Sequence, residues 1–141
     1  MVGGSQGAKI FSKLVPKLIE NLSSKSKKQL MVVQQVRKED MELTINSYKE
    51  MKIKSIIKNF FDDIYLQLDK ADLIISRCGS STLAEIELYN KFSVLFPLPS
   101  AKDNHQYSNA VEFKKNNQCL ICDEKKSNFC LLYTSDAADE S

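Results

Sequence analysis

The stretch "ADLIISRCGSSTLAEIELYNKFSVLFP", residues 71–97, contains a complete strand–helix–strand pattern. Its first part, "ADLIIS" (Ala71–Ser76), is almost entirely apolar, and "FSVLFP" (Phe92–Pro97) repeats that character before it ends on a proline. Apolar strands of this kind are typical of a parallel sheet that is covered on both faces. The glycine turn and the helix between them supply the crossover that parallel strands require. The stretch therefore predicts a βαβ unit.

The same alternation of strand and helix continues in both directions along the chain. Strands are expected at residues 29–36, 52–60 and 118–122, and helices or helical turns at 38–51, 62–71 and 103–117. Strands that alternate with helices indicate an α/β protein with a Rossmann-like, doubly wound parallel sheet. Ligands of such sheets bind beyond the carboxyl ends of the strands, so the loops at that edge are the candidate site.

The first helix follows a glycine loop near the amino end of the sequence. Its apolar residues recur at helical spacing and are Ile10, Phe11, Leu14, Val15, Leu18, Ile19 and Leu22. Pro16 falls inside this pattern, and we expect it to kink or break the helix because it cannot donate a backbone hydrogen bond.

Composition and charge exclude several classes of protein. The 141 residues are 43% hydrophobic, which suits one domain with a core, and the net charge of +2 is too small for a dedicated nucleic-acid binder. No apolar run approaches the ~20 residues that span a bilayer, and no signal peptide is evident. The sequence is therefore interpreted as cytosolic, with a weak attraction of its lysines to anionic lipid left open.

Four cysteines, Cys78, Cys119, Cys122 and Cys130, raise the question of metal or redox chemistry. Cys119 and Cys122 form a C-x-x-C pair, but a zinc site would need a second pair, and a redox pair would normally open a helix. This pair lies instead in an apolar, strand-like run. We predict buried, reduced thiols and no metal site.

All four glycines fall at two strand-to-helix junctions, and the first junction is "VGGSQGAK" (residues 2–9). A helix start offers unpaired N–H groups and the positive end of the helix dipole, which suit a phosphate. Ser5 and Gln6 could add side-chain donors. No Walker-type Gly-Lys-Ser/Thr follows, so a tight turn without a ligand remains an equal alternative.

The second junction is "SRCGSSTLAE" (residues 76–85), where Gly79 permits the turn. The hydroxyl and N–H groups of Ser80, Ser81 and Thr82 could hold a diphosphate without a metal ion. The structural alternative is a capping box, in which Glu85 bonds the backbone at the start of its own helix and Thr82 is the N-cap.

Arg77 precedes this turn, and its guanidinium could either face an anion or pair with Asp72.

A third motif, "PLPSAKDNHQYSNA" (residues 97–110), carries His105, Gln106 and Asn109. At helical spacing these three side chains can share one face. Neutral donors and acceptors suit the hydroxyls and amide of a sugar, and they are poor metal ligands as a set.

Structural alternatives remain for this helix start. Asp103 or Asn104 is a plausible N-cap. His105 alone could be a surface histidine without a role, or a general base, although no neighbouring group that would tune its pKa is identifiable.

In this order, "GGSQGA", "ADLIISRCGSSTLAE" and "PLPSAKDNHQYSNA" resemble the C-terminal domain of the MurG family of bacterial glycosyltransferases. "QQVRKED" and "FFDD" also resemble the family's intervening segments, and the resemblance covers residues 2–126. It implies the C-terminal half of a GT-B glycosyltransferase, the half that binds UDP-N-acetylglucosamine, over residues 1–127. The remaining residues, 128–141, resemble translated adaptor sequence and are expected to lie outside the domain.

The resemblance also implies roles for individual residues. Ser5 and Gln6 would meet the diphosphate, and the backbone of Phe61 in "FFDD" would read uracil. The turn that would wrap the nucleotide consists of Ser80, Ser81, Thr82, Leu83, Ala84 and Glu85.

Within that turn, Glu85 would hold the ribose hydroxyls, and Arg77 would support the same site. Gln106 matches the glutamine that reads the sugar, and His105 and Asn109 flank it.

The family's chemistry is an inverting transfer of GlcNAc to the 4-hydroxyl of MurNAc in lipid I, which gives lipid II for peptidoglycan. No metal or other cofactor is implied, because helix starts can stabilise the departing diphosphate. The general base is expected in a "GGTGGH"-like loop of the N-terminal half. No such loop occurs in this sequence, so the chain alone is expected to be inactive.

The resemblance implies that lipid I is bound through the N-terminal half. It also implies a peripheral location on the cytoplasmic face of the bacterial inner membrane, and no nucleic-acid partner.

Two other functions remain open. A UDP-GlcNAc 2-epimerase shares the architecture but resembles "SDSGG" at the second junction, where this chain has "SRCGSS". A non-catalytic nucleotide-sugar-binding subunit with a separate membrane partner would carry the same binding motifs.

Overall fold

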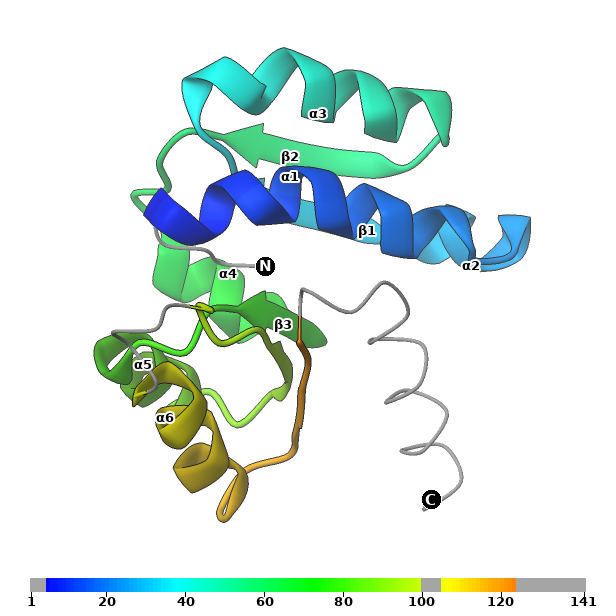
Figure 1. Cartoon of the computed structure of the whole chain (residues 1–141). Helices are drawn as coiled ribbons and strands as arrows, with labels where there is room; N and C mark the ends of the chain where they lie inside the picture. The colour runs from blue at the N-terminus through cyan, green and yellow to red at the C-terminus, as the bar shows by residue number, and fades with distance from the viewer. Residues whose placement is uncertain (1–4, 100–104, 124–141) are drawn as a thin grey trace. The chain divides into compact units, whose positions relative to one another are not determined.

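The structure, a computed structural model, describes residues 5–99 and 105–123, with side chains from residue 9 onward, and divides into two compact units, Met1–Gln67 and Leu68–Ser141. From β1 onward, strands and helices alternate along it as the sequence predicts (Figure 1). In chain order the elements are α1 (Ser5–Glu20), α2 (Ser24–Gln29), β1 (Met31–Gln35), α3 (Lys38–Glu50), β2 (Lys54–Lys58), α4 (Ile64–Lys70), β3 (Leu73–Ser76), α5 (Ser80–Glu87), β4 (Phe92–Leu95), α6 (His105–Lys114) and β5 (Cys119–Ile121).

The first unit contains a parallel pair of strands, β1 and β2, joined through α3. Their register runs from Met31 opposite Lys54 to Gln35 opposite Lys58. Figure 1 shows α3 running along β2, and α3 also contacts α1. The buried side chains of this unit include Phe11, Val15, Ile19, Val32, Val36, Tyr48 and Ile53.

Two features of the first unit differ from the prediction. Pro16 was expected to kink or break the first helix, and α1 continues through it, so a break is wrong. Proline removes one helical hydrogen bond, but Val15 and Ile19 on either side are buried, and that burial offsets the loss.

The short helix α2 was not predicted, because its sequence "SKSKKQ" has no apolar periodicity. The Ser23 hydroxyl caps this helix by accepting a hydrogen bond from the Ser26 N–H at 3.1 Å.

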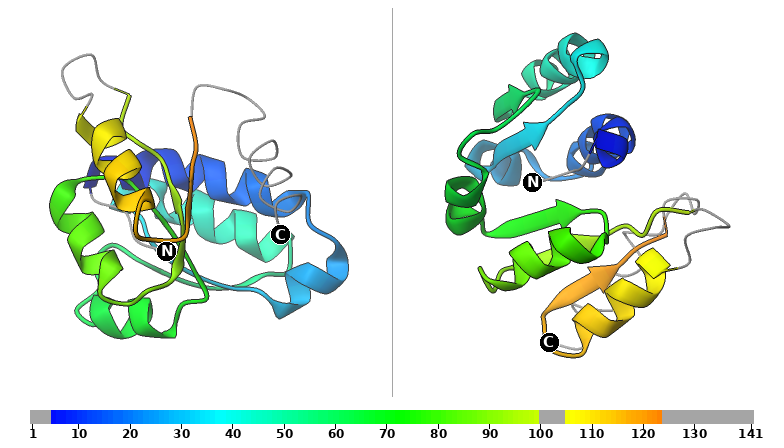
Figure 2. Two further views of the ribbon diagram at one scale, coloured as in Figure 1. Left: turned by 90° about the horizontal axis from the view of Figure 1, so that it is seen from below. Right: turned by 90° about the vertical axis from the view of Figure 1, so that its left-hand side faces the viewer.

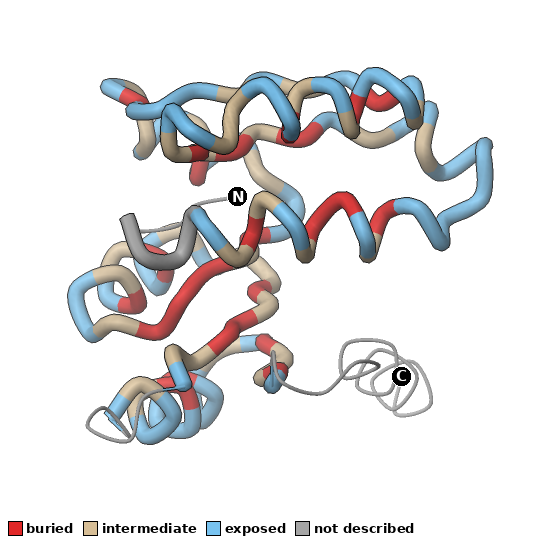
Figure 3. Tube along the Cα trace, turned by 45° about the horizontal axis from the view of Figure 1, so that its top comes forward, coloured by how far each residue is buried: buried red, intermediate tan, exposed pale blue. Residues whose placement is uncertain are grey.

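The second unit contains three parallel strands in the order β3-β4-β5. Each neighbouring pair is joined by a helix, α5 or α6, as the βαβ prediction requires, and α6 packs beside α5 and β5 (Figure 2). Buried positions follow the strands and the inward turns of the helices (Figure 3). The buried apolar side chains here are Leu68, Ile74, Leu83, Ile86, Leu95, Phe96, Ala110 and Phe113.

A buried polar pair lies inside the first unit. The Tyr48 hydroxyl on α3 donates a 2.6 Å hydrogen bond to Oε1 of Gln34 on β1, and both side chains are at most 1% exposed. Burial raises the pKa of Tyr48 well above its ordinary range. Within the described residues, the Nε2 atom of Gln34 has no hydrogen-bond partner, so only the oxygen of this carboxamide is hydrogen-bonded.

Removing the Tyr48 hydroxyl tests this pair. Tyr48→Phe leaves the Gln34 carboxamide without any partner in the core, and we expect it to lower the free energy of unfolding by about 1–3 kcal/mol in urea titrations. The double variant Gln34→Leu/Tyr48→Phe should recover most of that loss, because neither polar group then remains buried.

Tyr107→Phe is the matched control, since its side chain is 58% exposed. A Tyr48→Phe effect no larger than that of the control would contradict the importance of the buried bond.

Candidate functional site

The start of α5 has the geometry of an anion-binding helix terminus. Gly79 is the N-cap, with extended backbone at φ −63° and ψ 146°, and the first helical bond runs from the Leu83 N–H to the Gly79 carbonyl at 3.0 Å. The N–H groups of Ser80, Ser81 and Thr82 therefore have no partner within the helix. Ser80 and Ser81 are exposed and Thr82 is half-buried, so the first turn can be approached by a ligand.

The capping box, the structural alternative for Thr82 and Glu85, is wrong. The helix begins at Ser80, which places Thr82 in the third helical position instead of at the N-cap, and Gly79 has no side chain to cap with. Glu85 is half-buried one turn further along, where it is too far into the helix for the reciprocal bond of a capping box. The cap alternative for Glu85 is thereby removed. Leu83 is buried, so that position offers a ligand only backbone, whereas Ala84 is exposed.

Arg77 ties the ends of two strands together. Its side chain is buried, and its Nη1 atom donates to the carbonyls of Phe96 and Pro97 at 3.3 and 3.2 Å. Arg77 directly follows β3, and the two carbonyls directly follow β4. The guanidinium thus fixes the backbone of both loops and places a positive charge at the carboxyl edge of the sheet.

Gln106 and Asn109 on α6 reach the same edge. The Gln106 Oε1 atom accepts hydrogen bonds from the backbone N–H groups of Cys78, at 3.2 Å, and Leu98, at 2.9 Å. The Asn109 Nδ2 atom donates to the Cys78 carbonyl at 3.1 Å. The second and third sequence motifs therefore converge in space, as the parallel topology predicts.

His105 differs from its two neighbours in its surroundings. It is exposed, as are Ser108 and Glu112 on the same side of α6, whereas Gln106 and Asn109 are half-buried and contact Cys78. The three predicted site residues thus differ in exposure, and Gln106 and Asn109 contact the loops. Asp103 and Asn104, the predicted N-caps, lie outside the described residues.

The predicted site residues of the first unit are described only in part. Ser5 and Gln6 open α1, as a helix start after a glycine loop predicts, but their side chains and the loop itself lie outside the described part of the chain. Phe61 is 3% exposed, and the Lys58 ammonium lies 5.4 Å from the centre of its ring. With its ring buried, Phe61 offers a ligand mainly its backbone.

The cysteines behave as buried thiols. Cys78, Cys119 and Cys122 are buried and unbridged, which confirms the prediction for these three, while Cys130 lies outside the described residues. Burial raises the pKa of the Cys78 thiol from 9.0 to about 12, and Cys119 and Cys122 add to the rise while Arg77 opposes it. Burial likewise raises the pKa of Cys119.

Two further features of the described residues bear on the site. The described residues contain no group of three histidine, cysteine or carboxylate side chains placed to hold a metal ion. A polar hollow of about 420 Å³ is lined by Asn90, Lys91, Lys114, Lys115, Asn116, Asn117 and Gln118, which precede β4 and β5 and so lie at the amino edge of the sheet. The hollow is therefore at the opposite edge from the converging motifs.

Comparison with known proteins identifies the family. The model of the glycosyltransferase family 28 C-terminal domain matches residues 1–132. The chain belongs to this family. The resemblance inferred from the three motifs is confirmed, and the fold is the Rossmann-like C-terminal half of a GT-B glycosyltransferase.

Named relatives agree with this family. Over 139 residues the chain is 40% identical to the UDP-N-acetylglucosamine--N-acetylmuramyl-(pentapeptide) pyrophosphoryl-undecaprenol N-acetylglucosamine transferase of Rickettsia felis, covering 98% of the chain and 36% of that protein. A protein of the same name from Zymomonas mobilis is 38% identical over 128 residues, covering 91% of the chain and 33% of the relative. The chain thus spans about a third of the length of these curated relatives.

A solved structure shows the same architecture. The crystal structure of Acinetobacter baumannii MurG superposes with a TM-score of 0.78 at 27% identity, covering 97% of this chain and 41% of that one. Within the described residues, no helix is both long and apolar enough to cross a membrane.

The raised pKa of Cys78 predicts a protected thiol. A pKa of about 12 against 9.0 makes the thiolate roughly a thousandfold scarcer in the folded chain near neutral pH, and burial blocks access as well. Alkylation by iodoacetamide, followed by peptide mass spectrometry, should label Cys78 rapidly in urea and at least a hundredfold more slowly without it.

The same shift has a defined effect on stability. The unfolded thiol ionises first, so the contribution of Cys78 to the free energy of unfolding should be constant below pH 9 and fall as the pH rises toward 12. Rapid labelling of Cys78 in the folded chain would contradict both expectations.

Proposed function

We propose that this chain is the donor-binding part of an inverting glycosyltransferase that moves GlcNAc from UDP-GlcNAc to the 4-hydroxyl of MurNAc in lipid I and so makes lipid II for peptidoglycan. The observation that carries the proposal is the convergence of α5 and α6 at one sheet edge, through the contacts of Gln106 and Asn109 with Cys78. The named relatives, N-acetylglucosamine transferases by name, are 40% and 38% identical to this chain.

The start of α5 suits the nucleotide part of the donor. The partner-free N–H groups of Ser80, Ser81 and Thr82 and the positive helix end favour a diphosphate, and the charge of Arg77 lies in the loop just before them. Charge builds on the departing UDP as the bond to the sugar breaks, so groups already aimed at it stabilise the transition state. Glu85, one turn further into the helix, would accept hydrogen bonds from the ribose hydroxyls.

The start of α6 suits the sugar. His105 is exposed there and can donate or accept a hydrogen bond, and Gln106 and Asn109 are its neighbours on the helix. For the first unit, taken by itself, the family resemblance assigns a diphosphate contact to Ser5 and Gln6 and a uracil contact to the backbone of Phe61.

The rest of the reaction is assigned to parts that this chain does not supply. As the family resemblance implies, lipid I, the general base and the contact with the cytoplasmic face of the inner membrane are proposed to involve an N-terminal half. Nucleic acid is not proposed as a partner. The chain alone is expected to bind the donor without transferring the sugar.

The sugar preference of the chain tests the proposal. Isothermal titration calorimetry should show tighter binding of UDP-GlcNAc than of UDP-glucose, by about tenfold, because a site built for the acetamido group loses hydrogen bonds with glucose. Equal affinities would contradict GlcNAc selection, and absence of binding to either would contradict the donor-binding role.

Glu85→Ala tests the assigned ribose contact. The charge-assisted bonds to the ribose would be lost, and we expect the affinity for UDP to fall by at least tenfold in calorimetry. Because Glu85 does not cap its helix, a loss of UDP affinity in this variant would not come from a lost helix cap.

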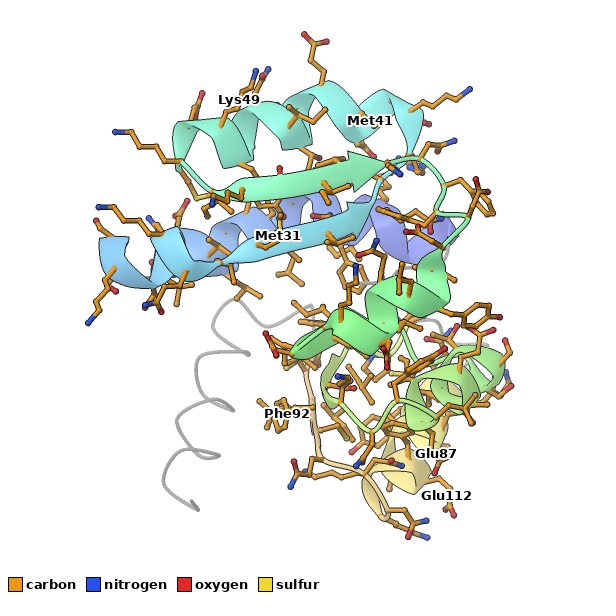
Figure 4. All side chains as sticks on the ribbon, turned by 180° about the vertical axis from the view of Figure 1, so that it is seen from behind. Met31, Met41, Lys49, Glu87, Phe92 and Glu112 are labelled. Carbon is orange, nitrogen blue, oxygen red and sulfur yellow. The ribbon has the colours of Figure 1, made fainter. Side chains whose placement is uncertain are left out.

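Glu87→Ala is the matched control on the same helix, since Glu87 is exposed and its carboxylate accepts a bond from Asn117 (Figure 4). Equal UDP affinities in the Glu85 and Glu87 variants would remove the ribose role from Glu85.

A further inference from the structure

Lysines gather at the amino edge of the parallel strand pair in the first unit. Strand β1 begins at Met31, directly after α2 and its C-cap Leu30, and β2 begins opposite Met31 in the register. Figure 1 shows α2 and the turn between α3 and β2 at this same end of the two strands. We call the lysines of these segments the lysine edge, and they are Lys25, Lys27, Lys28, Lys49, Lys52 and Lys54.

Few carboxylates oppose the charge of the lysine edge. No aspartate or glutamate occurs between Glu20 and Glu39, the segment that contains α2 and β1. None occurs between Glu50 and Asp62 either, the segment that contains β2. The amino edge of this strand pair therefore carries an excess of positive charge.

The ammonium groups of the lysine edge are accessible. Five of the six side chains are exposed, and Lys27 is half-buried. Within the described residues, none of the six forms an ion pair with a carboxylate, whereas Arg37, beyond the other end of β1, pairs with Asp40 at 3.2 Å. An anionic partner can therefore approach these six lysines without displacing a carboxylate of the described residues.

Helix dipoles explain only half of these lysines. Lys27 and Lys28 lie in the last turn of α2 and Lys49 in the last turn of α3, where a cation is favoured. The other three lie outside those turns. Lys52 also has a left-handed backbone with φ 58°, a conformation that glycine adopts at lower cost. The fold alone therefore does not require lysine at all six positions.

Two exposed apolar side chains flank α2. Leu22 precedes the Ser23 cap and is 43% exposed, and Met31 opens β1 and is 54% exposed. Lysines beside exposed apolar side chains suit a lipid surface, because the ammonium groups meet lipid phosphates while the apolar groups enter the headgroup region. A nucleic-acid surface would be expected to use arginine and aromatic side chains, and residues 21–35 and 49–56 contain neither.

We propose that the lysine edge, together with Leu22 and Met31, is a contact surface for a bilayer that contains anionic phospholipid. This contact belongs to the chain itself and is additional to the membrane contact that the proposed function assigns to an N-terminal half. Within the first unit it lies at the amino edge of the strands, whereas Phe61, the residue assigned to uracil, follows the carboxyl end of β2.

Sedimentation of the full chain with sucrose-loaded vesicles tests the proposal. Vesicles of equal parts phosphatidylglycerol and phosphatidylcholine should bind the chain at low salt, and pure phosphatidylcholine should bind at least tenfold more weakly. Each lysine near an anionic surface strengthens binding by about fivefold. Lys25→Gln/Lys27→Gln/Lys28→Gln should therefore weaken binding at least tenfold, and about 0.5 M salt should have a similar effect because it screens exposed charges.

Lys9→Gln/Lys13→Gln/Lys38→Gln is the matched control. It removes the same charge from exposed positions on α1 and at the start of α3, outside the lysine edge, and we expect less than a threefold effect. Equal losses in the two triple variants would overturn the proposal, because net charge alone would then explain the binding. If the α2 variant does not fold, Lys52→Gln/Lys54→Gln supplies the same comparison.

NMR with a spin-labelled lipid in the same vesicles locates the contact. The amide signals of residues 22–31 and 51–54 should broaden, and those of residues 38–42, at the other end of α3, should not. Broadening at residues 38–42 without any at residues 22–31 would overturn the proposal.

Two further outcomes separate the alternatives. Duplex DNA in the same buffer is the probe for nucleic acid, and binding to DNA through the three α2 lysines, without binding to vesicles, would overturn the lipid proposal. A chain that binds UDP-GlcNAc but no vesicles would overturn the lipid surface and leave the proposed function intact. A chain that binds vesicles but not UDP-GlcNAc would contradict the proposed function alone.

Discussion

The hydrogen bonds that the Gln106 carboxamide accepts from Cys78 and Leu98 are the constraint on which the candidate site of the second unit depends. Two parallel strands that end side by side leave diverging loops, and the N–H groups of those loops need partners once the ladder has ended. Arg77 satisfies two of the carbonyls, and Gln106 satisfies two of the N–H groups. A loop whose N–H and carbonyl groups are hydrogen-bonded in this way has a fixed backbone. A fixed backbone allows the free N–H groups at a helix start to bind an anion without reorganisation.

The parallel sheet determines which features can meet. Because β3 and β4 run in the same direction, the helices that follow them begin at the same edge, and the polar residues at those helix starts lie together. The lysine- and asparagine-lined hollow lies at the other edge, before β4 and β5. The convergence of helix starts and the buried arginine favour the carboxyl edge as the ligand site.

Much of this organisation could be predicted from the sequence, because it follows from local patterns. Alternating apolar runs and helical periodicities gave the strands and most helices, and the glycine turn located the start of α5. Helix α2 escaped prediction because it has no apolar face, and its only signal is the Ser23 cap. Pro16 was expected to kink or break α1, but the helix continues because burial of the neighbouring residues outweighs one lost backbone bond. In both cases the local sequence preference alone did not decide the structure.

The errors at the site have a different origin. Thr82 and Glu85 have the spacing of a capping box, but the helix starts three residues earlier than that box requires, at a glycine cap. Helical spacing correctly grouped Gln106 with Asn109, but no sequence pattern could show that the Gln106 oxygen is used by two backbone groups in other loops. Spacing identifies which side chains share a face, whereas the partners of each atom depend on contacts between segments that are distant in sequence.

The central claim is that the carboxyl edge of the β3-β4-β5 sheet binds the nucleotide sugar. The most direct measurement is a titration of the ¹⁵N-labelled chain with UDP-GlcNAc, followed by NMR amide shifts. The account predicts saturable shifts at Ser80, Ser81, Thr82 and His105, with Asn90 and Asn116–Gln118 unaffected. Shifts confined to the residues of the hollow, with none at the start of α5, would contradict it.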